Sequence, residues 1–136
     1  MPEQQDGFEP AGFAQGFLDR SGPYFLRPDG TSTIVALRVL ESHGNYTGVA
    51  HGGVLATLAD VALSFQLHDS ERPRLQVATV SMTTNFLASV VAGDWLEAHC
   101  RIDRKGQRIA YASGEIRRGD QIVMTMSGVY SIIRKP

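Results

Sequence analysis

The sequence predicts an α+β fold in which an antiparallel sheet of about five to six strands wraps around one long central helix. The helix is indicated by the run from Gly53 to His68, which contains no proline and is too long for a single strand. Nearly every direction around this run is apolar, which is typical of a buried helix. The rest of the chain has mainly strand patterns, and only a curled sheet could cover so much apolar helix surface.

Strand patterns occur once before the helix and four times after it. The first, Thr31–Leu40, is rich in β-branched residues, and Trp95–Asp103 alternates between apolar and polar side chains. The others are Leu75–Leu87, Arg108–Arg117 and Gln121–Ile133, with hairpin turns at Lys105-Gly106 and Gly119-Asp120. We expect the four strands that follow the helix to form a meander.

Residues 1–136 are expected to form a single domain, because a chain of 136 residues with 43% hydrophobic content can bury one sizeable core. Residues 1–22 are an N-terminal extension, in which Phe13 and Phe17 stand four apart and suggest a short helix. The last strand carries apolar residues on both faces, which suggests that another subunit covers its outer face.

The composition limits which partners the protein can bind and in which cell compartment we expect it. Lys and Arg number 13 against 14 Asp and Glu, so the chain lacks the basic excess that nucleic-acid binding needs. We expect no membrane span and no secretory signal, because no apolar stretch is long enough and the first residues lack the pattern. The single cysteine, Cys100, is interpreted as a small core residue. Because one cysteine cannot form an internal disulfide, we expect the protein in the reducing cytoplasm.

The helix carries one narrow polar stripe, whose members all point to one side: Gly53, Thr57, Asp60, Ser64 and His68. A carboxylate in the middle of an apolar helix is costly unless it is partnered, which makes Asp60 the candidate catalytic group. The alternative is a structural carboxylate that caps a neighbouring loop. Ser64 is interpreted as a packing or hydrogen-bonding hydroxyl, and His68, which shows no pairing, as a surface or loop residue.

The helix entrance, His51-Gly52-Gly53, has no short side chain to cap the helix. Unpaired backbone N–H groups at such an end can hold an oxyanion or a polarised carbonyl, although the three residues alone could be only a tight turn. The rise along the helix from Gly53 to Asp60 is ~10 Å. This distance is too long for the Gly53 N–H and the Asp60 carboxylate of one chain to contact the same reacting carbon. If both act on one substrate, the carboxylate comes from a second subunit, which predicts a homodimer.

The segment Gly44–Asp60 (GNYTGVAHGGVLATLAD) resembles the signature of the PaaI-like, phenylacetate-degradation type of hotdog-fold thioesterase, in the 4-hydroxybenzoyl-CoA thioesterase superfamily. Asn45, His51 and Asp60 match the spacing of that signature without gaps. The likeness covers roughly residues 30 to 134, including Ala78–Leu87 and the basic hairpin before Ile109.

The resemblance implies an acyl-CoA thioesterase with a hotdog fold that needs neither a metal nor another cofactor. The Gly53 N–H would polarise the thioester carbonyl, Asn45 would position the carbonyl or the attacking water, and His51 would brace the junction. Asp60 of the neighbouring subunit would be the general base or the nucleophile. Further substrate contacts are expected from Gly52, Phe86, and Thr79 or Ser81, either of which could orient Asp60 or its water.

Some interpretations stay open at this point. Asn45 could simply adopt a left-handed turn conformation. The hairpin residues Arg104, Lys105 and Arg108 are either a solvated turn or a binding place for the coenzyme A phosphates. The stretch Asn85–Ser89 departs from the family, since many relatives have a basic residue and a proline there, so a basic contact to the coenzyme is missing or is supplied elsewhere.

Two other functions compete with hydrolysis. A hotdog hydratase or dehydratase would pair a catalytic His with a carboxylate, and those motifs are absent from the sequence. A non-catalytic acyl-CoA-binding module would need an output element, for which the N-terminal residues leave little room. The sequence does not decide whether the acyl group is aromatic, such as phenylacetyl or hydroxybenzoyl, or an aliphatic chain of medium length. We expect at least a homodimer, and a homotetramer of two such dimers.

Overall fold

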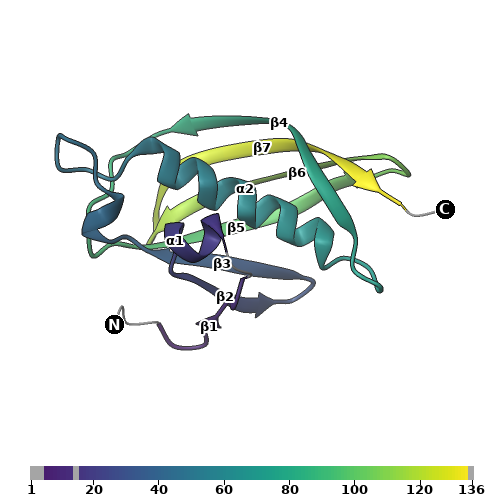
Figure 1. Cartoon of the computed structure of the whole chain (residues 1–136), viewed down its shortest axis with the longest axis horizontal. Coiled ribbons are helices and arrows are strands. Elements are labelled where there is room, and N and C mark those ends of the chain that lie inside the picture. The colour runs from purple at the N-terminus through teal and green to yellow at the C-terminus, as the bar shows by residue number, and fades with distance from the viewer. Residues whose placement is uncertain (1–4, 14–15, 135–136) are drawn as a thin grey trace.

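The computed structural model describes residues 5–13 and 16–134, which form one antiparallel sheet curled around a long helix (Figure 1). The sheet has seven strands, so the expected count was too low. The strands are β1 (Glu9–Pro10), β2 (Tyr24–Asp29), β3 (Ser32–Arg38), β4 (Gln76–Phe86), β5 (Trp95–Lys105), β6 (Ile109–Arg118) and β7 (Gln121–Ile133). The helices are α1 (Phe17–Ser21), the 3-10 turn η1 (Glu41–His43) and α2 (Gly52–His68). This is the hotdog arrangement that the sequence predicted.

The strands lie in the order β1-β2-β3-β5-β6-β7-β4. Strands β5, β6 and β7 form the expected meander, but the prediction that β4 begins it was wrong, because β4 pairs with β7 at the far edge. Helix α2 runs across the inner face of the sheet between β3 and β4, and this crossing carries the chain to the opposite edge (Figure 1). Within the described residues, one edge of the 11-residue strand β4 is therefore left unpaired.

Strands β1 and β2 were not expected from the sequence. Strand β2 returns into β3 through a tight turn in which Asp29 pairs with Ser32 and Gly30 has a φ of +64°. Glycine adopts this left-handed conformation readily, so the Asp29-Gly30 pair is a hairpin signal. The short helix expected within residues 1–22 corresponds to α1, whereas residues 1–4 and 14–15 of that extension lie outside the described part of the chain.

Helix α2 packs one side against the sheet and leaves the other side open. Its buried positions are Leu55, Leu58, Ala59, Ala62, Leu63, Gln66 and Leu67. The polar stripe lies on the open side, where Asp60, Ser64 and His68 are half-buried beside the apolar Val61 and Phe65. In the single chain the helix is therefore not buried all round, as its sequence suggested. No helix within the described residues has the length and apolar character needed to cross a membrane.

One buried polar side chain ties α2 to β3. Gln66 Oε1 accepts a hydrogen bond from the Thr33 N–H at 3.0 Å, and Gln66 Nε2 donates to the Thr33 carbonyl at 2.8 Å. The same amide nitrogen also donates to the Ala62 carbonyl at 3.0 Å. The amide thus makes the two backbone hydrogen bonds that a neighbouring strand would otherwise make with Thr33. These bonds fix the position of the helix over the sheet.

Substituting Gln66 tests this tie. Gln66→Leu leaves the Thr33 N–H and carbonyl without their partner, and we expect the free energy of unfolding to fall by about 1–3 kcal/mol. Gln107→Leu, at an exposed position of the β5–β6 turn, is the control and should change it by less than about 0.5 kcal/mol. Urea denaturation of both variants measures the difference. Equal stability in the two would contradict the role given to Gln66.

Candidate active site

Asp60 receives two hydrogen bonds from hydroxyl groups of the sheet. Thr79 Oγ1 donates to Asp60 Oδ1 at 2.8 Å, and Tyr130 OH donates to the same oxygen at 3.0 Å. Asp60 Oδ2 has no hydrogen-bond partner in the described part of the chain. One carboxylate oxygen is therefore fixed by the protein, and the other is available to a ligand.

The β4–β7 ladder brings the two donors together, because Thr79 and Tyr130 are direct partners in its register. The Tyr130 ring is fully buried and lies over Gly128, where an added Cβ would come within 2.6 Å of the ring. Gly128 thus leaves the space that the ring occupies. Burial, and then the charge of Asp60, raise the pKa of the Tyr130 phenol above its ordinary value, so the phenol stays protonated and remains a donor.

The structure separates the two hydroxyl candidates on β4. Thr79 contacts Asp60, whereas the register shifts between Thr79 and Ser81, and Ser81 pairs with Val129. Because successive residues of β7 point to opposite faces, Val129 and Ser81 lie on the outer face, away from Asp60. The second donor is instead Tyr130, which was not among the residues singled out from the sequence. Its alternation with Val129 places it on the inner face, and that signal could have found it.

The entrance of α2 is capped, so the expectation of an uncapped end was wrong. The Gly53 N–H donates to His51 Nδ1 at 2.8 Å, which is the role that a Ser or Asp side chain usually has. The Gly52 N–H has no partner in residues 5–13 and 16–134. Gly52 also lies close to Phe86, whose ring an added Cβ would meet at 3.3 Å. The entrance therefore offers one free N–H and one that is shared with His51.

Asn45 organises the loop that leads into α2. Its Oδ1 accepts from the Thr47 N–H at 2.8 Å, the Thr47 hydroxyl at 2.7 Å and the Val49 N–H at 3.3 Å. Asn45 does not have the left-handed conformation that was the alternative, because no described residue other than glycine has a positive φ. Asn45 Nδ2 has no partner among the described residues and can donate to a ligand.

The two halves of the candidate site lie apart in one chain. Asp60 stands in the middle of α2, whereas Gly53, His51 and Asn45 gather at its start. The rise between Gly53 and Asp60 is ~10 Å along the helix axis. Both lie on the side of α2 that the sheet leaves open.

The three basic residues of the β5–β6 hairpin do not act as one group. Lys105 Nζ lies 2.8 Å from the carboxylate of Glu71, and its hydrogen bond lowers the pKa of that carboxyl below the ordinary value. Arg104 and Arg108 instead line an open cavity of about 400 Å³ together with Tyr111. Neither arginine has an ion-pair partner within the described residues.

Cys100 has the environment of a core residue rather than of a nucleophile. Burial raises the pKa of its thiol to about 12, so little thiolate forms at neutral pH. In the described part of the chain, no three His, Cys, Asp or Glu side chains come together in a way that could hold a metal ion.

Comparison with known proteins identifies the family of this chain. The model described as the thioesterase superfamily matches residues 47–125. The Pseudomonas aeruginosa protein PA0474, provisionally named an esterase, is 41% identical over 97% of this chain and 99% of its own. Acyl-coenzyme A thioesterase 13 of Mus musculus is 30% identical over 61% of this chain and 59% of its own. The PaaI protein of E. coli, from the phenylacetic acid degradation operon, superposes with a TM-score of 0.78. That match covers 88% of this chain and 86% of PaaI at 22% identity, and it concerns the fold.

The fold and the family match together define a hotdog-fold hydrolase, and its central helix carries a hydrogen-bonded carboxylate. The chain belongs to the thioesterase superfamily, and it is a thioester hydrolase. The resemblance found in residues Gly44–Asp60 is thereby confirmed.

Replacing His51 tests whether its ring serves as a helix cap. His51→Ala leaves the Gly53 N–H without a side-chain acceptor, and we expect the free energy of unfolding to fall by about 1 kcal/mol. His51→Asn supplies another capping side chain and should restore stability to within about 0.5 kcal/mol of wild type. Urea denaturation of the three proteins gives the values. An equal loss in both variants would show that the ring stabilises the chain by other contacts.

Proposed function

We propose that the protein hydrolyses an acyl-coenzyme A to a free acid and coenzyme A, with Asp60 as the catalytic carboxylate. The observation that carries the proposal is the arrangement around Asp60, in which two donors hold Oδ1 while Oδ2 stays unpartnered on the open side of α2. A purely structural carboxylate would be expected to use both oxygens. The name of the Mus musculus relative, an acyl-coenzyme A thioesterase, supports this substrate class.

Two chemical routes use this carboxylate. In one, Asp60 Oδ2 takes a proton from a water molecule whose oxygen attacks the carbonyl carbon; the C–S bond breaks, and the proton passes to the leaving thiolate. In the other, Oδ2 itself attacks, the thiolate leaves, and water then hydrolyses the mixed anhydride. Both routes need an ionised carboxylate of fixed orientation, which Thr79 and Tyr130 provide. Neither route calls on a metal or on another cofactor.

The thioester carbonyl binds at the entrance of α2. The Gly52 N–H is free and the Gly53 N–H is shared with His51, and both stand at the positive end of the helix dipole. Asn45 Nδ2 adds a side-chain donor from the preceding loop. The Phe86 ring, which lies against Gly52, forms the wall beside the thioester.

Each site is shared between two subunits of a homodimer. A carbonyl held at Gly53 of one chain is out of reach of Asp60 in the same chain, because the rise between them is ~10 Å. A two-fold axis that sets the α2 entrance of each subunit beside the middle of α2 in the other brings both groups to one substrate, and it creates two equal sites.

Edge strand β4 supports this dimer. No strand in the described part of the chain pairs with its outer edge, which is 11 residues long, and the side chain of Val80 is 60% exposed there. Open edges of this length are normally covered in native proteins. Antiparallel pairing of two β4 strands would continue the sheet through both chains and close over the half-buried side of α2. We assign the contact between two dimers, and hence a homotetramer, to the outer face, where Val129 is half-buried and Ile133 is 51% exposed.

The phosphates of coenzyme A are assigned to Arg104 and Arg108. Their guanidinium groups have no ion-pair partner in the described residues, and phosphate is a ligand that such groups bind well. The ammonium group of Lys105 is already paired with Glu71 and contributes less. Tyr111 is the cross-strand partner of Arg104, and its exposed ring offers a stacking surface for the adenine. These residues would replace the basic contact that Asn85–Ser89 lacks.

The acyl group is aromatic, such as phenylacetyl or hydroxybenzoyl, or an aliphatic chain of medium length, and the reaction takes place in the cytoplasm. The aromatic option draws support from the E. coli PaaI protein, which comes from the phenylacetic acid degradation operon. The compartment is inferred from the single cysteine, Cys100.

Asp60→Asn tests the proposal directly. The amide keeps the shape of the side chain but cannot act as a base, so we expect kcat to fall by about 10² or more. Release of free thiol from aromatic and aliphatic acyl-CoAs measures the rate. Asp120→Asn, at an exposed position in the β6–β7 turn, is the matched control and should keep its activity.

Three outcomes of that assay have different meanings. A loss confined to Asp60→Asn supports the catalytic carboxylate. Equal activity in Asp60→Asn and wild type would remove Asp60 from the mechanism. Tight acyl-CoA binding by a wild type that turns over no substrate would favour the non-catalytic binding module instead.

A further inference from the structure

A buried histidine that the proposed reaction does not use lies just before the loop that leads into α2. His43 is the last residue of the 3-10 turn η1 and is only 6% exposed. We propose that His43 is a positioning residue, which holds the carbonyl-binding entrance of α2 in place by tying it to the end of α1. The inference rests on the proposed function, and it makes a helix of the N-terminal extension part of the site.

Both nitrogens of the His43 ring are hydrogen-bonded to the backbone. The Leu40 N–H donates to Nδ1 at 2.9 Å, so the proton of the neutral ring is on Nε2. Nε2 donates to the Ser21 carbonyl at 2.7 Å, and the Gly22 carbonyl lies 3.1 Å from the same nitrogen. Carbonyl groups at the end of a helix have no partner within the helix, and the ring supplies one at the end of α1.

The backbone of His43 forms the base of the loop that carries the carbonyl-binding groups. Its carbonyl accepts a hydrogen bond from the His51 N–H at 2.8 Å, and the loop between these two residues contains Asn45. The His51 ring in turn accepts from the Gly53 N–H at the start of α2. Hydrogen bonds thus run without a gap from the end of α1 to the helix entrance. A displacement of His43 would therefore move the Asn45 side chain and the helix entrance together.

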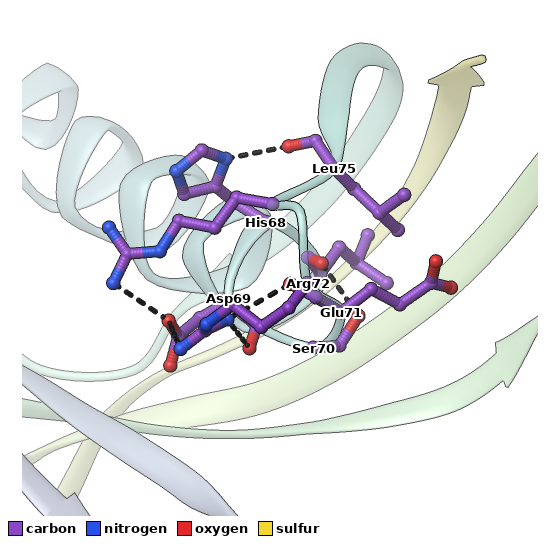
Figure 2. Close-up of polar contacts among 8 residues, drawn as sticks. His68, Asp69, Ser70, Glu71, Arg72 and Leu75 are labelled. Carbon is purple, nitrogen blue, oxygen red and sulfur yellow. Dashed lines mark hydrogen bonds and ion pairs between the residues drawn. The ribbon is translucent and has the colours of Figure 1, made fainter. Parts of the chain in front are cut away.

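Figure 2 shows hydrogen bonds at the opposite end of α2, and these join residues that are close in the sequence. His68 Nδ1 lies 2.6 Å from the Leu75 carbonyl, and Asp69 Oδ1 accepts from Arg72 at 3.0 Å (Figure 2). The entrance differs, because the His43 ring reaches 22 residues back along the chain to its partner in α1. The position of the entrance therefore depends on how the N-terminal part of the chain packs.

Two substitutions of His43 separate the two sides of its ring. His43→Asn keeps an acceptor in the place of Nδ1 for the Leu40 N–H, but its short amide cannot reach the carbonyls of α1. His43→Gln places an amide N–H near the position of Nε2 and can keep the tie to α1. We expect kcat for acyl-CoA hydrolysis to fall by about 10-fold or more in His43→Asn. In His43→Gln it should stay within about 3-fold of wild type.

Release of free thiol gives kcat and KM, and kcat is referred to the folded fraction that urea denaturation measures for each variant. The KM should change by less than about 3-fold, because the entrance acts mainly on charge that develops in the transition state. Arg72→Gln is the control, since it removes only exposed contacts at the opposite end of α2, and it should keep both constants.

Gly22→Ala moves the carbonyls of α1 instead of the ring, because the added Cβ would lie 2.9 Å from the Tyr24 nitrogen. It should also lower kcat, and it keeps the test decisive if His43→Asn does not fold. An active wild type whose kcat is lowered by neither His43→Asn nor Gly22→Ala would overturn the inference and leave the proposed function intact. An equal loss in His43→Asn and His43→Gln would do the same. A wild type that hydrolyses no acyl-CoA would overturn the proposed function together with the inference.

Discussion

Two hydrogen bonds to one oxygen of Asp60, from Thr79 and Tyr130, join the middle of α2 to the edge pair β4–β7. An ionised carboxylate in an otherwise apolar helix would be destabilising without such donors, and each hydrogen bond to a charged group contributes about 1.5–3 kcal/mol. The donors can reach Asp60 only because the sheet curls over the helix and brings its last strands to the open side. The curvature of the sheet and the orientation of the carboxylate thus depend on each other.

The same constraint underlies the proposal that two subunits share each site. The donors of Asp60 stand on the strand pair at the open edge of the sheet, so the free carboxylate oxygen lies where a second subunit can dock. The entrance of α2, with Gly53 and Asn45, is held at the far end of the helix by the His51 cap and the loop before it. A rigid helix keeps these groups apart, and in the proposed homodimer a two-fold partner would supply what each lacks.

The sequence was sufficient to predict α2 and the strands after it, because the apolar periodicity is long and the hairpin turns are clear. It also indicated that Asp60, whose charge interrupts an apolar run, must be partnered, and the structure shows two donors to its carboxylate. Alternation along β7 places Tyr130 on the inner face, but the sequence could not pair it with Asp60, because that contact depends on the register between two strands far apart in the chain. The family resemblance implied that His51 braces the junction by hydrogen bonding, but its role as the helix cap was not predicted, because an imidazole at a helix start is not a common capping signal. Pro28 obscured strand β2, although the turn at Gly30 was readable.

The central claim is that one active site uses the carbonyl-binding residues of one subunit and Asp60 of the other. Co-expression of Asp60→Asn and Asn45→Ala chains with different tags, followed by two-step purification, gives mixed dimers. Each parent is expected to lose activity by about 10². A mixed dimer contains one site with both native residues, so it should recover about half of the wild-type rate. A mixed dimer no more active than its parents would place the whole site in one chain and contradict this account.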